Sequence, residues 1–343
     1  MATSANLFRH QELAFRTQYA ELKERVLASG RLLPGTPGTL ARRGGTGYAY
    51  WYRVYYSVPG KQSEDFVGRD DRETVVQDMR YQMEFSEWVA AQVSNLRKLG
   101  FQVADKSVAR VLVELHNRGA FDAGLTLVGT LAFMAWLNEL GAVAVTARTQ
   151  DLDPARRDPL KLAVPFSFMQ SMLATQMPFF EVPGMPSGTP ATSVKLPGVQ
   201  GFRVDVLAPG PSLGAVIRVP ELQWCAQSVP YFDYLLESPE SAAALAGGHC
   251  VPIRLPQAAR LIWHKLYAST QRHGFPEKAA KDRRQALVLA AVLAEEDPGA
   301  LRSACEAADP GMMRPVRPLL ARLKEQAQAH PQAVEILDLC LNR

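Results

Sequence analysis

The spacing of apolar residues in the first part of the chain predicts a helix followed by a β-hairpin. Apolar positions recur at helical intervals over residues 7–29, and Gly30 stands where such a helix would end. After a run rich in proline and glycine, the aromatic and β-branched residues of Tyr48–Ser57 favour a strand. A turn at Gly60 leads to a second strand that ends near Gly68, so the two strands form a hairpin.

Two longer helical patterns complete an N-terminal region that we place at residues 1–120, with the hairpin at about 48–68. These patterns cover Glu73–Leu99 and Ser107–Asn117. The many aromatic side chains of the hairpin leave two interpretations open, packing against the flanking helices or stacking on the bases of a nucleic acid. Packing is the commoner role of aromatic residues in a small sheet.

Beyond Gly124 the pattern becomes that of an α+β core, which we place at residues 121–255. An apolar strand at Leu125–Val128 leads through a Gly-Thr pair into a helix over Leu131–Leu140, and Val143–Thr149 favours another strand. Three later segments also favour strands: Phe179–Val182, Thr192–Leu196 and Gly201–Leu207.

The remaining chain, residues 256–343, is helical in pattern throughout and predicts an all-α C-terminal domain. Its helices are separated by prolines, which cannot continue a helix: Pro276, Pro298, Pro310 and Pro331. A chain of 343 residues is long enough for two or three domains, each with its own core.

Composition and charge indicate a soluble globular protein and exclude a membrane-spanning one. The chain is 47% apolar and 21% charged, and no apolar run reaches the ~18 residues that cross a bilayer. Its first residues lack the basic and apolar regions of a secretory signal, so we expect a cytoplasmic protein with no membrane partner. The four cysteines lack the spacing of a zinc or redox pair. The net charge of +4 is mild and allows a nucleic-acid partner without demanding one.

The strongest chemical signal is the Asp-x-Asp pair formed by Asp151 and Asp153. Residues two apart in a strand point to the same face, so the two carboxylates are expected to lie together. Like charges this close repel each other unless a cation lies between them, and Mg²⁺ prefers oxygen ligands of this kind. On its own the same pair is common as a solvated strand end, so its context has to decide.

Two further features supply that context. Gly129 and Thr130 lie between a strand and a helix, where free N–H groups and the helix dipole bind phosphate. The glycine lets a phosphate approach, and Thr130 either adds a hydroxyl donor or serves as the helix N-cap. Asp205 lies within an apolar strand, where a lone charge is costly unless it is paired or binds metal. We therefore expect Asp205 to be the third ligand of a metal site with the Asp-x-Asp pair.

This order of strand, Gly-Thr pair, helix, Asp-x-Asp and later single aspartate resembles the polymerase-β-like nucleotidyltransferase superfamily. More narrowly, five segments are similar to a bacterial family of uncharacterised nucleotidyltransferase-fold proteins, itself akin to the nucleotidyltransferase toxins of abortive-infection systems: Leu127–Phe133, Phe202–Pro209, Val251–Pro256, Trp263–Leu266 and Lys281–Ala286. The likeness extends from about Leu33 to Ala290. Where the superfamily usually has Gly-Ser or Gly-Gly, this chain has Gly-Thr, which keeps a hydroxyl.

The resemblance implies a nucleotidyltransferase-type mixed sheet flanked by helices, and an enzyme that transfers a nucleotidyl group from a nucleoside triphosphate to an acceptor hydroxyl. It implies two Mg²⁺ ions, with Mn²⁺ as an alternative, held by Asp151 and Asp153. Asp205 would hold the ion that activates the acceptor. The acceptor is left open among RNA (including tRNA), protein and a small molecule, and an antitoxin-like protein is a candidate partner. The alternative is a catalytically silent protein of the same fold that binds a nucleotide or a protein partner.

Residues of the predicted C-terminal helices join the candidate nucleotide site. Lys265 has two interpretations, a point charge that reaches the triphosphate or a solvated helix lysine. Lys281 and Asp282 are either an ordinary surface pair or groups that orient Lys265 and the nucleotide.

Three other polar residues near these motifs are expected to be structural. His264 is expected to be a structural histidine rather than a general base. Arg148 and Arg203 are expected to point to the faces opposite their neighbouring aspartates.

Overall fold

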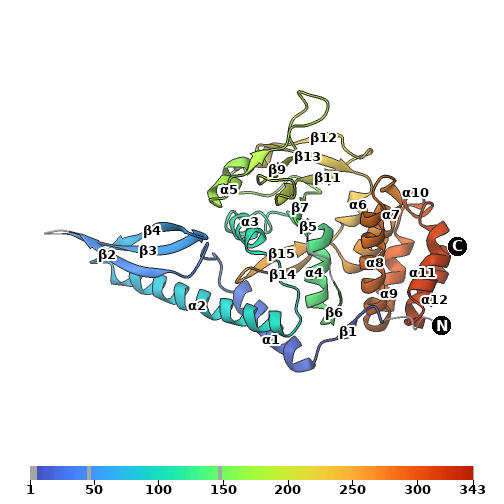
Figure 1. Ribbon diagram of the computed structural model, residues 1–343, viewed down its shortest axis with the longest axis horizontal. Coiled ribbons are helices and arrows are strands. Elements are labelled where there is room, and N and C mark those ends of the chain that lie inside the picture. The colour runs from blue at the N-terminus through green and yellow to red at the C-terminus, as the bar shows by residue number, and fades with distance from the viewer. Residues whose placement is uncertain (1–5, 45–47, 146–148, 343) are drawn as a thin grey trace.

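The protein has an α+β fold in which a narrow arm projects from a larger body (Figure 1). The computed structural model describes residues 6–44, 48–145 and 149–342. In the arm, a three-stranded antiparallel sheet lies along part of a long helix; its elements are β2 (Thr39–Gly44), β3 (Ala49–Val58), β4 (Lys61–Arg69) and α2 (Glu73–Lys98). The predicted hairpin is therefore part of a larger sheet. Its strand β2 was not predicted because it lies within the run rich in proline and glycine, which reads locally as a loop.

An eight-stranded mixed sheet forms the centre of the body. Strand β7 (Asp151–Ala155) pairs in parallel with β10 (Arg203–Asp205) and β11 (Leu207–Pro209), and antiparallel with β5 (Thr126–Val128). The outer strands are β8 (Phe180–Glu181), β9 (Ser193–Lys195), β12 (Val216–Val219) and β13 (Trp224–Val229). The predicted mixed sheet is confirmed.

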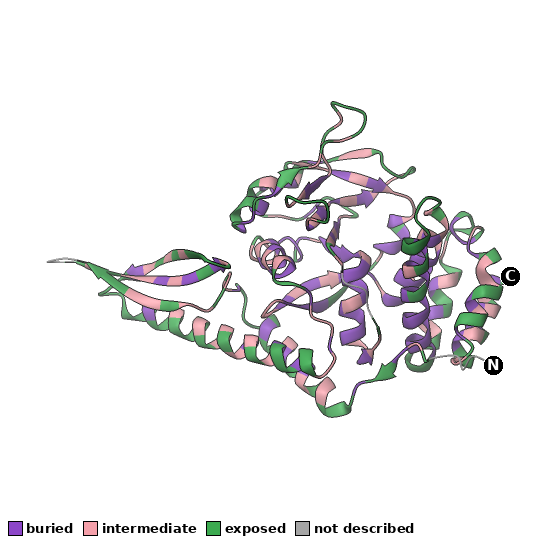
Figure 2. Ribbon diagram, in the orientation of Figure 1, coloured by how far each residue is buried: buried purple, intermediate pink, exposed green. Residues whose placement is uncertain are grey.

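Helices and a second hairpin cover this sheet. Helix α4 (Gly129–Glu139) follows β5 directly and packs against the hairpin of β14 (Glu240–Ala246) and β15 (His249–Leu255). On its other side β15 contacts α1 (Leu13–Leu27), α2 and α3 (Lys106–Asn117). Buried residues concentrate in these layers, whereas the arm is largely exposed or half-buried (Figure 2). The smaller elements are β1 (Arg9–His10), which pairs with β6 (Ala142–Val143), α5 (Phe168–Ala174), the 3₁₀ turn η1 (Pro220–Leu222) and α6 (Phe232–Leu235).

The C-terminal region is helical, as predicted. Its longest helix, α8, is buried without interruption from Gln285 to Ala294 because α7, α9, α11 and α12 pack around it. Proline begins α8, α9, α10 and α12, where its missing N–H costs nothing. The elements are α7 (Ala258–Gln271), α8 (Pro276–Glu296), α9 (Pro298–Glu306), α10 (Pro310–Met313), the 3₁₀ turn η2 (Arg317–Leu319), α11 (Leu320–Gln326) and α12 (Pro331–Leu341).

Two predicted strands differ from the structure. The strand expected at Val143–Thr149 is wrong for Ala144, Val145 and Thr149, because β6 ends at Val143 opposite the two-residue β1. Residues 146–148 lie outside the described part of the chain. The strand expected over Gly201–Leu207 is divided after Asp205, since β10 pairs with β9 whereas β11 pairs with β13. Asp205 therefore lies at a strand end.

None of the described helices combines the length and the apolar character needed to cross a bilayer. The division into regions 1–120, 121–255 and 256–343 stays a prediction. Helix α3, assigned to the first region, contacts both strands of the β14–β15 hairpin in the second.

Candidate active site

The parallel pairing of β7 with β10 brings three aspartates to one face of the sheet. Arg203 lies opposite Asp151 and Val204 opposite Leu152, so the register continues with Asp205 beside Asp153. Leu152 and Val204 point the other way and are fully buried. We call the side on which Asp151, Asp153 and Asp205 lie the acidic face.

Gly129 allows the acidic face to approach the start of helix α4. Its φ is +71°, and a Cβ at this position would lie 2.1 Å from Oδ2 of Asp153. The preceding residue, Val128, is the sheet partner of Asp153. Any side chain at position 129 would strain the backbone and collide with the carboxylate. Glycine is thus required by the approach of Asp153, which the sequence did not indicate.

Helix α4 begins at Gly129, two residues earlier than predicted, and Thr130 is not its N-cap. The N-cap is Val128, which makes no side-chain capping bond. Thr130 lies in the first turn and its side chain is buried. Amide N–H groups of a first helical turn have no partner within the helix, so they are available to an oxygen ligand.

The charges of four other predicted residues act on the pKa of Asp153. Burial, together with the nearby carboxylates of Asp205 and Asp151, raises the pKa of Asp153 to about 7, although Lys265 and Lys281 act to lower it. Burial is the larger cause and the neighbouring carboxylates add to it. Ionising all three aspartates together is therefore costly in the folded protein.

Asp205 already has hydrogen bonds on one oxygen. The Ser193 hydroxyl donates to Oδ1, and Nε of Arg203 donates to the same atom at 2.6 Å. Arg203 also donates to the Ser193 hydroxyl at 2.8 Å. The expectation that Arg203 points away from Asp205 is wrong, because residues two apart on a strand share a face. Arg148 lies outside the described residues.

Lys265 and Asp282 form a buried ion pair where α7 packs against α8. Nζ of Lys265 lies 3.3 Å from Oδ1 of Asp282, and Nε of Arg272 donates to Oδ2 at 2.6 Å. The Lys265 and Asp282 side chains are only 6% and 5% exposed, so Lys265 is not a solvated lysine and Asp282 is not part of a surface pair. Burial alone raises the pKa of Asp282, but Lys265 and Arg272 outweigh it and hold that pKa below its ordinary value.

His264 lies among packed side chains, as expected for a structural histidine. Its Nε2 is 3.3 Å from the carbonyl oxygen of Pro230, and its ring meets that of Phe232 edge-on at 5.0 Å. Burial lowers the pKa of His264 to about 4, so the ring is neutral at pH 7.

The donor set of the acidic face suits a hard divalent cation. All three side chains offer carboxylate oxygens, which are the ligands that Mg²⁺ prefers. As placed, no group of three or more His, Cys, Asp or Glu side chains within 6–44, 48–145 and 149–342 converges closely enough to hold a metal ion. One of the three carboxylates, that of Asp205, is instead bonded to Arg203 and Ser193. A cation bound between these carboxylates would offset the repulsion that contributes to the raised pKa of Asp153.

Two residues around the site were not found from the sequence. Ser193 faces Asp205 because β9 and β10 pair antiparallel in a register that no local pattern reveals. Arg272 follows α7 and reaches Asp282 only because α7 and α8 pack together. For Arg203 a signal was present, since the Arg-x-Asp spacing on a strand places both side chains on one face.

Comparison with known proteins identifies the family. The family described as nucleotidyltransferase matches residues 106–309, more than half of the chain, and this range contains every candidate residue of the site. No curated protein matches the chain, and no solved structure does. The chain belongs to the nucleotidyltransferase family.

Proposed function

We propose that this nucleotidyltransferase carries out its reaction at the acidic face, with two Mg²⁺ ions held by Asp151, Asp153 and Asp205. The observation that carries the proposal is the strand register that places the three aspartates on one face, with Asp153 directly beside the first turn of α4 and its pKa raised to about 7. Bound there, the ions would supply the positive charge that stabilises the attacking and leaving oxygens of an in-line displacement.

The first turn of α4 and two lysines are the proposed binding groups for the nucleoside triphosphate. Gly129 and Thr130 offer N–H groups and a hydroxyl next to the acidic face. Lys265 and Lys281 lie close enough to lower the pKa of Asp153, so their charges also act on a phosphate bound there. Asp282 is the proposed positioning residue, because its contact with Nζ holds Lys265 in place.

In the proposed reaction the acceptor oxygen forms a bond to the α-phosphorus as the bond from that phosphorus to the bridging oxygen breaks. Pyrophosphate leaves with the electron pair of the broken bond. The proton of the acceptor hydroxyl passes to Asp205, whose Oδ2 has no hydrogen-bond partner in the described part of the chain. Ser193 would orient that carboxylate through its hydrogen bond to Oδ1.

Nucleotide transfer is tested with each triphosphate labelled at the α-phosphate, together with Mg²⁺ and separate pools of RNA (including tRNA), protein and small-molecule acceptors. The wild-type protein is expected to label one pool. Asp151→Asn and Asp153→Asn should each reduce labelling at least about 100-fold, since an interaction made with developing charge is lost. Asp158→Asn, the same change at an exposed aspartate, is the matched control.

Two results would contradict this proposal. Labelling by Asp153→Asn at the wild-type rate would remove the acidic face from catalysis. Absence of labelling by the wild type, with triphosphate binding retained, would instead support the catalytically silent alternative.

A further inference from the structure

The outer face of the arm carries a row of aromatic side chains. Every second residue of β3 is turned inward: Arg53 donates to backbone carbonyls of Pro34 and Thr36, and Trp51 lies against Arg80 of α2. The alternate positions of β3 point outward. Three aromatic residues at these positions, with one from β4, form what we call the aromatic row: Tyr50, Tyr52, Tyr56 and Phe66. The ring of Phe66 lies 5.7 Å from that of Tyr52, yet Phe66 is 62% exposed.

A cavity of about 380 Å³ lies at the base of the arm. It is bounded by the β3–β4 turn, by α2 and α3, and by the β14–β15 turn, and the arm sheet ends close to α3 in Figure 1. Tyr56 belongs to both the aromatic row and the cavity lining, so the two are continuous. Lys106, Arg110 and His249 also line this cavity.

The cavity holds two cations without an anion. Neither Arg110 nor Lys106 makes an ion pair or a side-chain hydrogen bond with any residue that the structure describes, although Arg110 is partly buried and burial lowers its pKa. A partly buried arginine is normally paired. The four arginines of the arm's three-stranded sheet, by contrast, each have an acidic partner: Arg42 with Asp70, Arg43 with Glu64, Arg53 with Asp65, and Arg69 with Asp71. An anion is therefore expected in the cavity rather than beside the arginines of the arm sheet.

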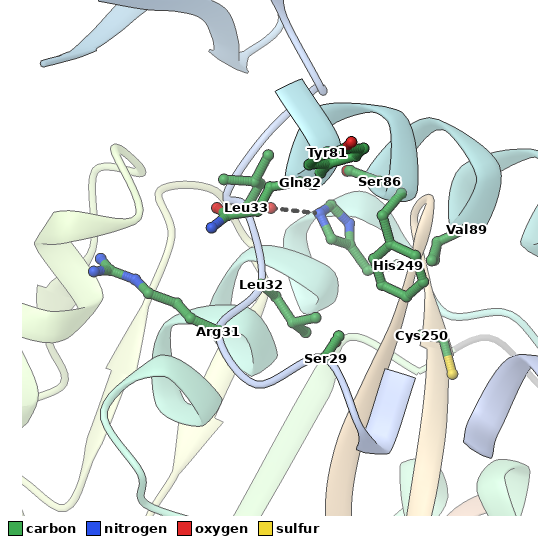
Figure 3. Close-up of a pocket in the computed structure, with 11 residues that line it drawn as sticks. Ser29, Arg31, Leu32, Leu33, Tyr81, Gln82, Ser86, Val89, His249 and Cys250 are labelled. Atoms are coloured by element: carbon green, nitrogen blue, oxygen red, sulfur yellow. Dashed lines mark hydrogen bonds between the residues drawn. The ribbon is translucent and has the colours of Figure 1, made fainter. Parts of the chain in front are cut away.

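His249 adds a requirement for a hydrogen-bond donor. It also borders a neighbouring pocket of about 200 Å³, where its Nε2 lies 3.1 Å from the carbonyl oxygen of Leu33 (Figure 3). A carbonyl only accepts, so Nε2 carries the proton, and burial keeps the pKa of His249 low and the ring neutral. Nδ1 is then an acceptor, and it is buried without a partner in the described structure. A ligand with an anionic group and a hydroxyl or amino donor would satisfy all three side chains.

We propose that the arm and the cavity at its base bind a single-stranded nucleic acid, with a phosphate beside Arg110 and Lys106 and the adjoining bases stacked on the aromatic row. A nucleotide carries the required anion, the required donors and a flat ring. Stacking on exposed aromatics tolerates any base sequence, and phosphates bind unpaired cations. RNA and DNA share this chemistry. A role of this nucleic acid as the nucleotidyl acceptor rests on the proposed function, whereas its binding to the arm does not.

The test measures binding of fluorescently labelled ten-nucleotide RNA and DNA single strands to the full-length protein by anisotropy, in EDTA and without triphosphate. Phe66→Ala should weaken binding about tenfold by removing a stacking surface. Arg110→Gln should weaken it about fivefold and reduce the slope of log affinity against log salt by about one, since one phosphate contact is lost. The matched controls are Tyr81→Ala, a 61% exposed ring on α2, and Arg118→Gln, whose arginine is paired with Glu114 on the same helix as Arg110.

Each outcome decides the matter. Tighter binding of RNA than of DNA, or the reverse, identifies the source of the strand and supports the proposal if both variants weaken it. Binding unaffected by Phe66→Ala and Arg110→Gln overturns it. A labelled mononucleotide that binds as tightly as the strands and is weakened equally by Phe66→Ala and Arg110→Gln overturns it. A dimer dissociated by Phe66→Ala without strand binding also overturns it. Asp153→Asn should bind the strands like the wild type, so this test and the catalytic one fail separately.

Discussion

Two charged clusters in the body, the acidic face and the buried pair of α7 and α8, shift the pKa of an aspartate in opposite directions. Around Asp153, burial and two further carboxylates raise the pKa to about 7. Around Asp282, two cations more than offset burial and the pKa falls below its ordinary value. Asp282 therefore has its counter-charges within the fold, whereas we propose that Asp153 takes its counter-charge from a bound cation. The contrast separates a group that stabilises the protein from one with a proposed role in metal binding.

Removing the charge of Asp282 should have the largest effect on stability. Asp282→Asn leaves Lys265 buried without its counter-charge, so we expect the free energy of unfolding to fall by about 3–5 kcal/mol in urea denaturation. Asp338→Asn is the control, because Asp338 pairs with Lys324 where both side chains are more than 40% exposed. Loss of that exposed pair should change the free energy of unfolding little. Equal effects of the two substitutions would show that burial of the Lys265 pair has no energetic importance.

Replacing Asp153 by asparagine should instead raise the free energy of unfolding. Its folded-state pKa of about 7 lies above the ordinary value of 3.8, so the fold holds a proton and loses stability as pH rises between these values. Asp153→Asn removes that loss and should stabilise the EDTA-treated protein by about 2 kcal/mol at pH 8, less at pH 5. Mg²⁺ should then raise the melting temperature of the wild type but not of the variant. A variant less stable than the wild type at pH 8 would contradict the comparison.

His264 extends the comparison to a buried group that stays neutral. Its folded pKa of about 4 lies below the ordinary 6.5, so the unfolded chain takes up a proton first as pH falls, and stability decreases from pH 6.5 toward 4. The neighbouring cations Lys265 and Arg272 disfavour the charged ring, and Asp282 favours it. Between pH 7 and 5 the wild type should lose about 2 kcal/mol more than His264→Gln in urea denaturation. Parallel losses in both proteins would place His264 in a more polar setting.

The two clusters also differ in how far the sequence revealed them. The Asp-x-Asp alternation and the Gly-Thr turn are local, so the shared face of Asp151 and Asp153 and the presence of a helix after the turn follow from adjacent residues. That helix nevertheless begins two residues earlier than predicted. The proximity of Asp205 followed from its unusual place in an apolar strand, although that strand ends at Asp205 rather than continuing through it. The Lys265 pair depends on how α7 packs against α8, which no periodicity specifies.

The missed parts of the fold have the same cause. Strand β2 is formed by pairing with β3, and its own residues carry little strand preference. The opposite faces assumed for Arg203 and Asp205 were an error of local reasoning, because the spacing of two already places them together. Ser193 shows the limit of such reasoning, since its contact with Asp205 depends on the register between two strands.

Among the described residues, Arg203 is the one cation that makes a direct hydrogen bond to an aspartate of the acidic face. Its substitution should have the smallest effect of those considered. Its bond to Asp205 competes with a metal ion for the same carboxylate, but both side chains are partly exposed, which limits the pair to about 1 kcal/mol. Arg203→Gln should therefore lower the Mg²⁺ concentration for half-maximal thermal stabilisation roughly fivefold. Lys195→Gln removes the same charge from the neighbouring strand, where Lys195 donates to the carbonyl oxygen of Val199, and should change the half-maximal Mg²⁺ concentration less. Equal shifts would mean that only the net charge near the site matters. A higher half-maximal concentration would mean that Arg203 helps to hold Asp205 in place for the ion, so that the acidic face is partly organised from within.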